Sequence, residues 1–182
     1  MKHLKSIKRT CTSLAIILIA GCNTNFKEFE AVTVNRSGSF ELDMTPEFAF
    51  PLFTAPGEKL WISVWDPIIL NGDGYEEGTV WVTTNHGHTT YWYVAKYDTE
   101  ARLARYVRVT PDANSGTVDV SITSNGEGGS IVNVTYQLTG LSDAGNEAVA
   151  ELLSESAYEE MMEEWRSMVN SSRERIDKHF GL

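Results

Sequence analysis

The C-terminal segment carries the clearest hydrophobic pattern in the chain. Between Ala157 and Phe180, apolar residues recur every three or four positions and fall within an arc of about 120° on a helical wheel. Acidic residues lead and basic residues trail, the order that the helix macrodipole favours. The pattern predicts a long amphipathic helix that covers a large apolar partner. Its stripe consists of Tyr158, Met161, Met162, Trp165, Met168, Val169, Ile176 and Phe180, with Ser172 as a polar member.

The segment from Ser142 to Leu153 is predicted to be a separate helix. Its apolar residues Val149 and Leu152 lie roughly 170° away from the later stripe on the same wheel. One straight helix would expose one of the two stripes. We therefore predict a break or kink around Ser154–Ser156.

Alternation of apolar and polar residues predicts β-strands in the rest of the chain. A first strand is expected from Ala31 to Met44, and strands and turns follow from Trp65 onward. Short turns between successive strands predict antiparallel pairing. The later strands are expected at Thr79–Thr84, Thr90–Tyr97, Ala104–Thr110, Thr117–Ser124 and Ser130–Thr139.

Two short helices are expected between the first strand and the others. Thr45-Pro46-Glu47 joins an N-cap residue to proline at the first helical position, and Thr54-Ala55-Pro56 repeats this arrangement. The element order indicates an α+β fold of the helix-grip type. A curved antiparallel sheet of about seven strands wraps around the long C-terminal helix, and such a sheet can leave an internal cavity.

The N-terminus has the pattern of a secretory signal that is too short to span a membrane. Its closing residues Ile19-Ala20-Gly21-Cys22 resemble the lipobox of bacterial lipoproteins. The resemblance implies a signal peptide at residues 1–21, lipidation of Cys22, and a tether at residues 22–30 before the domain at 31–182. Asn23 in place of aspartate suggests sorting to the outer membrane, facing the periplasm. Ordinary secretion with a free Cys22 is the alternative.

Charge and cysteine content argue against some classes of function. Without the four bases of the signal, 11 Lys and Arg oppose 25 Asp and Glu, so the mature net charge is about −14. This argues against nucleic-acid binding, which needs basic patches. Cys11 leaves with the signal and Cys22 carries lipid, so no thiol remains for a disulfide or a metal.

A set of short motifs extends over most of the mature chain: Thr45-Pro46-Glu47, Ala49–Phe53, Gly57-Glu58, Trp61, Trp65-Asp66-Pro67, Gly78–Trp81, Tyr136–Leu141 and Tyr158–Trp165. These motifs resemble those of the START-like, or polyketide-cyclase-like (SRPBCC), superfamily. The resemblance implies a helix-grip fold around a hydrophobic cavity. Members of the superfamily bind lipids, sterols or polyketides, act as cyclases or dehydratases, or bind proteins.

Aromatic and sulfur-containing residues are the candidates for a ligand-binding wall. Tyrosine and tryptophan offer apolar area with one donor, and methionine adapts to irregular shapes. Core packing is the alternative role for each. The candidates are Trp81, Trp92, Tyr136, Tyr158, Met162 and Trp165. Tyr93, Tyr136 or Arg108 would supply polar groups inside the cavity, although Arg108 equally fits the outer face of the sheet.

No catalytic residue, metal site or cofactor is predicted. His86-Gly87-His88 supplies two potential metal ligands and lacks a third. Asp66, Asp73, Glu76 and Glu77 suit a solvated acidic turn better than a cation site. The leading hypothesis is a lipid-anchored envelope protein that binds a hydrophobic small molecule or lipid. A module that docks another envelope protein, and a cyclase- or dehydratase-type enzyme, are the alternatives.

Overall fold

The computed structural model describes residues 29–85 and 87–182. The predicted signal peptide, the predicted lipidation site Cys22, most of the predicted tether and His86 lie outside these residues. No helix among the residues described is long and apolar enough to cross a membrane.

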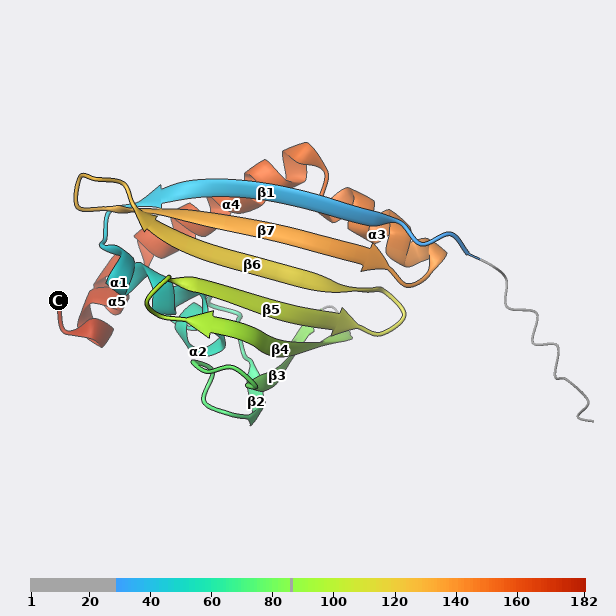
Figure 1. Cartoon of the computed structure of the whole chain (residues 1–182), viewed down its shortest axis with the longest axis horizontal. Coiled ribbons are helices and arrows are strands. Elements are labelled where there is room, and N and C mark those ends of the chain that lie inside the picture. The colour runs from blue at the N-terminus through green and yellow to red at the C-terminus, as the bar shows by residue number, and fades with distance from the viewer. Residues whose placement is uncertain (1–28, 86) are drawn as a thin grey trace, which may run out of the picture.

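A seven-stranded antiparallel sheet forms the body of the described chain, as the alternation pattern predicted (Figure 1). Its spatial order is β1-β7-β6-β5-β4-β3-β2, so that the first strand pairs with the last and only β1 departs from a simple meander. The strands are β1 Thr33–Leu42, β2 Ile68–Asn71, β3 Val80–Asn85, β4 His88–Asp98, β5 Leu103–Thr110, β6 Asn114–Ser124 and β7 Ser130–Gly140.

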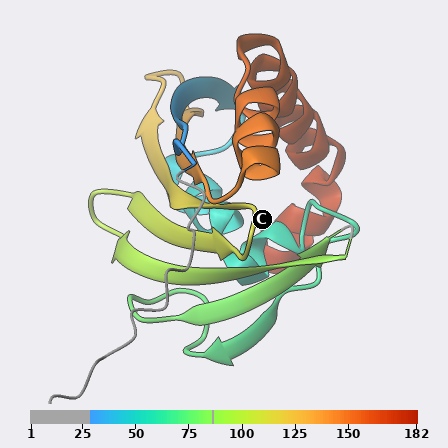
Figure 2. The same cartoon turned by 90° about the vertical axis from the view of Figure 1, so that its right-hand side faces the viewer.

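The sheet bends around the helices on its inner face (Figure 2). A β-bulge lies between Val94 and Lys96 where β4 pairs with β5, and bulges increase local twist and bending. Successive side chains alternate between the inner and the outer face. Val94 is fully buried on the inner face, whereas Tyr91 and Tyr93 are about half exposed on the outer face.

Three short helices carry the chain from β1 at one edge of the sheet to β2 at the other. They are α1 Pro46–Ala49, the 3-10 helix η1 Phe50–Phe53 and α2 Ala55–Glu58. The predicted cap at Thr54 is present, since its hydroxyl accepts a hydrogen bond from Gly57 N at 3.1 Å. The same hydroxyl donates to Pro51 O at 2.7 Å. Thr54 therefore closes one short helix and begins the next.

The predicted break before the long C-terminal helix is confirmed. Helix α3 (Asp143–Leu152) and helix α4 (Glu155–Ser171) are separated by a break at Leu153 and Ser154. Ser154 is the N-cap of α4, and its hydroxyl accepts a hydrogen bond from Ala157 N at 3.4 Å. Helix α3 contacts β7 and α4 contacts β1. The two helices thus lie along the strands at one edge of the sheet.

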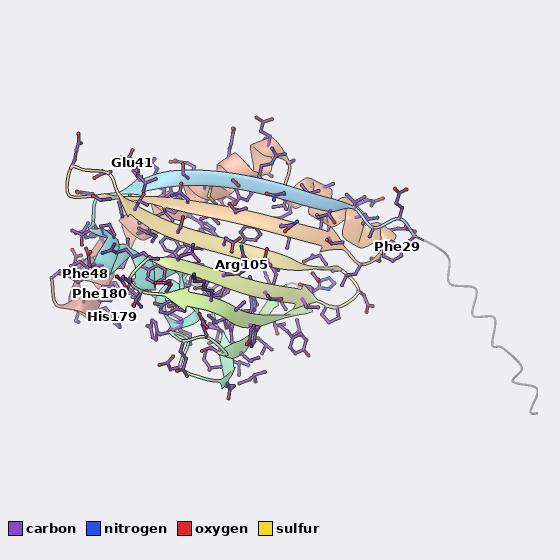
Figure 3. The ribbon with its side chains drawn as sticks, in the orientation of Figure 1. Phe29, Glu41, Phe48, Arg105, His179 and Phe180 are labelled. Atoms are coloured by element: carbon purple, nitrogen blue, oxygen red, sulfur yellow. The ribbon has the colours of Figure 1, made fainter. Side chains whose placement is uncertain are left out.

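The prediction of one continuous helix to Phe180 is wrong at Ser172, where α4 ends and α5 (Arg173–Phe180) begins. Ser171 donates its hydroxyl hydrogen to Ser167 O at 2.8 Å, a back-bond that bends helices. Beyond the break, Phe180 packs on Phe48 of α1 with ring centroids 5.8 Å apart (Figure 3). The short last helix therefore closes one end of the fold against α1.

Aromatic rings fill the centre of the space between the sheet and α4. Phe53 of η1 lies 6.1 Å from Phe40 of β1, 5.7 Å from Trp61 and 6.2 Å from Trp165 of α4, between ring centroids. The indole of Trp61 donates to Leu52 O at 2.7 Å. The short helices thus supply much of the core.

Candidate ligand-binding site

A hollow on the inner face lies beside β3, β4 and β5 and has a volume of about 500 Å³. We call it the Trp92 cavity. This volume is within the range of small-molecule binding sites. Its lining consists of Ile62, Val64, Trp65, Asp66, Thr83, Thr84, Asn85, Thr90, Trp92 and Arg108.

The register of three strands places the strand-borne lining on one face. Thr83 of β3 is opposite Thr90 of β4, and Trp92 of β4 is opposite Arg108 of β5. Because directly opposed residues share a face and the side-chain period is two, all four point inward. The other wall comes from the segment after α2, where Trp65 is held by a hydrogen bond from its indole to Ala55 O at 2.8 Å.

Trp92 forms a fixed aromatic wall in the cavity. Its indole nitrogen donates to Thr83 Oγ1 at 3.0 Å, and its ring stacks on Trp81 with centroids 5.7 Å apart and an interplanar angle of 1°. Trp81 in turn contacts Tyr106 edge-on at 5.6 Å. The buried indole nitrogen of Trp81 has no hydrogen-bond partner. The ring of Trp92 is therefore positioned by Thr83 in the cavity and by Trp81 in the core behind it.

Arg108 lies beside this wall on the inner face. Its guanidinium carbon is 5.0 Å from the centroid of the Trp92 ring, a cation–π distance. One terminal nitrogen donates to Thr110 Oγ1 at 3.4 Å, whereas the buried Nε has no partner. Burial lowers the pKa of Arg108, and Tyr136 opposes that shift. The outer-face position that the sequence also allowed for Arg108 is not adopted. Tyr93 lies half exposed on the outer face, so the prediction that it supplies a polar group inside the cavity is wrong.

Glu58, at the end of α2, is a functional candidate that the sequence analysis missed. Burial raises the pKa of Glu58 to about 8, so its carboxyl is largely protonated near neutral pH. Burial also raises the pKa of Tyr136 to about 12, with Arg108 lowering it and Glu58 raising it. Arg108 and Glu58 thus shift the pKa of Tyr136 in opposite directions. The only signal in the sequence was the position of Glu58 within the Gly57-Glu58 motif.

A second hollow, the β1–α4 groove, has a volume of about 330 Å³. Gly38 of β1 lets α4 approach, because a Cβ there would lie 2.8 Å from Met162 Cγ and 3.0 Å from Tyr158 Cε1. The α4 side of the groove carries Glu155, Glu159 and Glu163. Arg36 of β1 is the basic residue in the lining of the groove. Its lining consists of Arg36, Ser37, Gly38, Ser39, Phe40, Glu155, Tyr158, Glu159, Met162 and Glu163.

The six predicted wall residues do not meet in one cavity. Trp92 lines the Trp92 cavity, whereas Tyr158 and Met162 line the β1–α4 groove. The other three lie in the core and line neither hollow: Trp81 stacks on Trp92, Tyr136 contacts Tyr158, and Trp165 packs on Phe53 and Trp61.

Within the described part of the chain, no three His, Cys, Asp or Glu side chains come together as a metal site. His88 begins β4, and its predicted companion His86 lies outside the described residues. Asp66 lies at the rim of the Trp92 cavity and pairs with Lys59 at 3.4 Å. Asp73 accepts a hydrogen bond from Tyr75 N at 2.7 Å, as turn aspartates do.

Solved structures share this architecture. Ara h 8.0201 aligns with a TM-score of 0.58 at 15% identity, covering 77% of this chain and 99% of its own. Norcoclaurine synthase from Thalictrum flavum, in complex with dopamine and hydroxybenzaldehyde, aligns with a TM-score of 0.57 at 16% identity, covering 91% and 98%. Major latex-like protein 151 from Panax ginseng gives 0.58 at 14% identity, covering 76% and 96%.

The chain has the helix-grip fold. The identities are too low to carry more than the fold from these structures. No family model matches the chain, and no curated protein matches it.

Proposed function

We propose that this protein is a lipid-anchored envelope protein that binds a hydrophobic small molecule or lipid in the Trp92 cavity. The observation that carries the proposal is a hollow of about 500 Å³ on the inner face, walled by Trp65, Trp92 and Ile62. A site of this size with aromatic walls and a few polar groups is typical of small-molecule binding.

The fold supports the same proposal. A helix-grip protein, norcoclaurine synthase, has been solved with two small aromatic molecules, dopamine and hydroxybenzaldehyde. The aromatic rings of Trp65 and Trp92 offer apolar surfaces to an aromatic or aliphatic ligand here.

The envelope location is argued from the N-terminal sequence. The basic residues, the short apolar run and the lipobox-like Ile19–Cys22 support export and lipidation of Cys22. A lipid anchor with more than one acyl chain holds a protein stably on a membrane. Asn23 supports the outer membrane, with the domain facing the periplasm.

Native mass spectrometry of the purified protein tests the binding proposal. We expect an adduct of defined mass that organic extraction removes, and that is lost or reduced when Trp92→Ala opens the aromatic wall. Tyr91→Ala, on the outer face of the same strand, is the matched control and should keep the adduct. A protein without any adduct, which also fails to bind added apolar compounds, would contradict the proposal.

A protein-interaction module is the second candidate, favoured by an apolar row on the outer face. Ile68, Val82, Tyr91 and Val109 stand side by side across β2 to β5. Ile68 is 60% exposed and Tyr91 is 48% exposed, and contiguous exposed apolar area marks interaction sites. Photo-crosslinking from position 91 in the cell should give one discrete adduct, whereas crosslinking from position 119, a polar outer-face site, should not.

An enzyme of the cyclase or dehydratase type is a third candidate, favoured by Glu58. Burial gives its carboxyl a pKa of about 8, and perturbed acids cluster at catalytic sites. Turnover of a bound compound that Glu58→Gln abolishes without weakening binding would establish this role.

A further inference from the structure

Arg108 differs from the other arginines of the described chain in its partners. Four of them pair with carboxylates: Arg102 with Glu47, Arg105 with Asp119, Arg166 with Glu163 and Arg173 with Asp177. Two more donate to uncharged oxygens: Arg36 to Leu153 O and Arg175 to Ser172 Oγ. Arg108 has no carboxylate partner among the described residues, and its only hydrogen bond is a long one to Thr110.

The contrast within β5 is direct. Arg105 lies on the outer face, where its Nε and Nη2 donate to the two oxygens of Asp119 at 2.6 and 2.9 Å (Figure 3). Arg108 lies on the inner face, and its Nε is buried without a partner. Arg108 is partly buried, and burying even part of a cation without a carboxylate partner is costly.

Among the described residues around Arg108, no carboxylate neutralises it. The hydroxyls of Thr90 and Thr110 are 2.7 Å apart and bond to each other. The carboxylate of Asp66 lines the same cavity, yet it is 89% exposed and pairs with Lys59. The buried indole nitrogen of Trp81 is a further donor without a partner, and its ring stacks on Trp92.

We propose that Arg108 binds the carboxylate of an amphipathic carboxylic acid, whose apolar body lies against Trp92 and Trp65. This inference rests on the proposed function and names the ligand class. The planar guanidinium fork matches a carboxylate. A single cation beside the Asp66 rim suits a monoanion, whereas a phosphate dianion would require further bases in the cavity.

The test compares two ligands that differ only in the head group, decanoate and 1-decanol. Calorimetric titration of the purified protein should show tighter binding of decanoate. Arg108→Gln should weaken decanoate binding by about 10- to 100-fold, the range expected for hydrogen bonds to a charged group. Decanol binding should change by less than about threefold. Arg108→Lys keeps the charge and loses the guanidinium fork. Its affinity for decanoate should lie between that of the parent and that of Arg108→Gln.

Arg105→Gln is the matched control, since it removes an arginine from the other face of the same strand and should leave both affinities unchanged. Arg108→Gln also removes an unpaired buried charge, so the ligand-free variant should melt no lower than the parent. That result separates a lost contact from a misfolded protein.

The outcomes distinguish the carboxylate inference from the proposal that the cavity binds an apolar ligand. Equal affinities for decanoate and decanol, both unaffected by Arg108→Gln, would overturn the carboxylate inference and leave the apolar-ligand proposal standing. Binding of neither compound would overturn both. Selective loss of decanoate binding in Arg108→Gln would establish the inference.

Discussion

Glu58 is a single residue that makes the stability of this fold depend on pH. Its folded-state pKa of about 8 is above the ordinary value of 4.5 because burial disfavours the charged carboxylate. As pH rises from 4.5 to 8, the unfolded chain loses this proton while the folded chain keeps it. The protein therefore loses stability progressively as the pH rises through this window. The stability contributed by the protonated Glu58 is fully lost above it.

Replacing Glu58 by glutamine should remove this pH dependence. At pH 8, Glu58→Gln should be more stable than the parent by about 4 kcal/mol, the cost of a carboxyl whose pKa rises from 4.5 to about 8 on folding. At pH 4 the two should be equal, because both folded and unfolded parent chains are then protonated. Urea unfolding at the two pH values measures the difference.

Glu160→Gln on the exposed side of α4 is the control and should shift stability by no more than about 0.5 kcal/mol at either pH. A Glu58→Gln variant that is less stable than the parent at pH 8 would show that the ionised carboxylate has a stabilising partner.

The face of the sheet on which a single side chain lies was the hardest feature to predict from the sequence. In β4, Tyr91, Trp92 and Tyr93 are all aromatic, so polarity does not reveal which of them point inward. Pairing with β5 decides it, because Trp92 is opposite Arg108 on the inner face. Arg108 was equally compatible with either face for the same reason: its side depends on the register of its neighbours.

At the scale of elements, the seating of α4 on β1 depends on one missing side chain. Gly38 is where Tyr158 and Met162 approach the strand, and the hydroxyl of Tyr158 donates to Val134 O at 3.0 Å. A methyl group at this position would force both side chains to move. The packing of helix on sheet is therefore sensitive to a very small substitution.

Gly38→Ala should destabilise the protein by about 1–3 kcal/mol, the usual cost of inserting a methyl group into a packed contact. Ser39→Ala, at the neighbouring exposed position, should change stability by less than about 0.5 kcal/mol. Chemical denaturation of both variants gives the comparison. Equal stabilities of Gly38→Ala and the parent would show that α4 is not tightly seated on β1.

The helices show which boundaries a sequence pattern reveals. The break at Ser154 was predictable because the apolar stripes on either side are out of phase, and the structure places the N-cap there. The break at Ser172 was missed because the stripe continues in phase from Val169 to Ile176, both fully buried. Periodicity reports which side of a helix is buried, and an in-phase interruption leaves that side unchanged.

At the scale of the whole molecule, element order predicted the antiparallel sheet and the C-terminal helical segment that it wraps around. It did not predict the contents of the inner face. Phe53, Trp61 and Trp165 fill the centre, so the open volume lies to one side, next to Trp92. Helix η1 brings Phe53 inward and the turn after α2 brings Trp61 inward, and the volume of these side chains decides where a ligand has room.

The proposed anchoring of the molecule makes a prediction of its own. The chain has two cysteines, Cys11 within the predicted signal and Cys22 at the predicted lipidation site. Labelled palmitate should be incorporated into the parent and into Cys11→Ala, and should be absent from Cys22→Ala. Label on Cys22→Ala, or none on the parent, would refute lipidation at this position.

The most direct test of the account is an experimental structure of the protein with decanoate bound. We expect the carboxylate within hydrogen-bond distance of the Arg108 guanidinium and the alkyl chain along Trp92 and Trp65. Decanoate in the β1–α4 groove, or a Trp92 cavity that stays empty at saturating decanoate, would contradict the account.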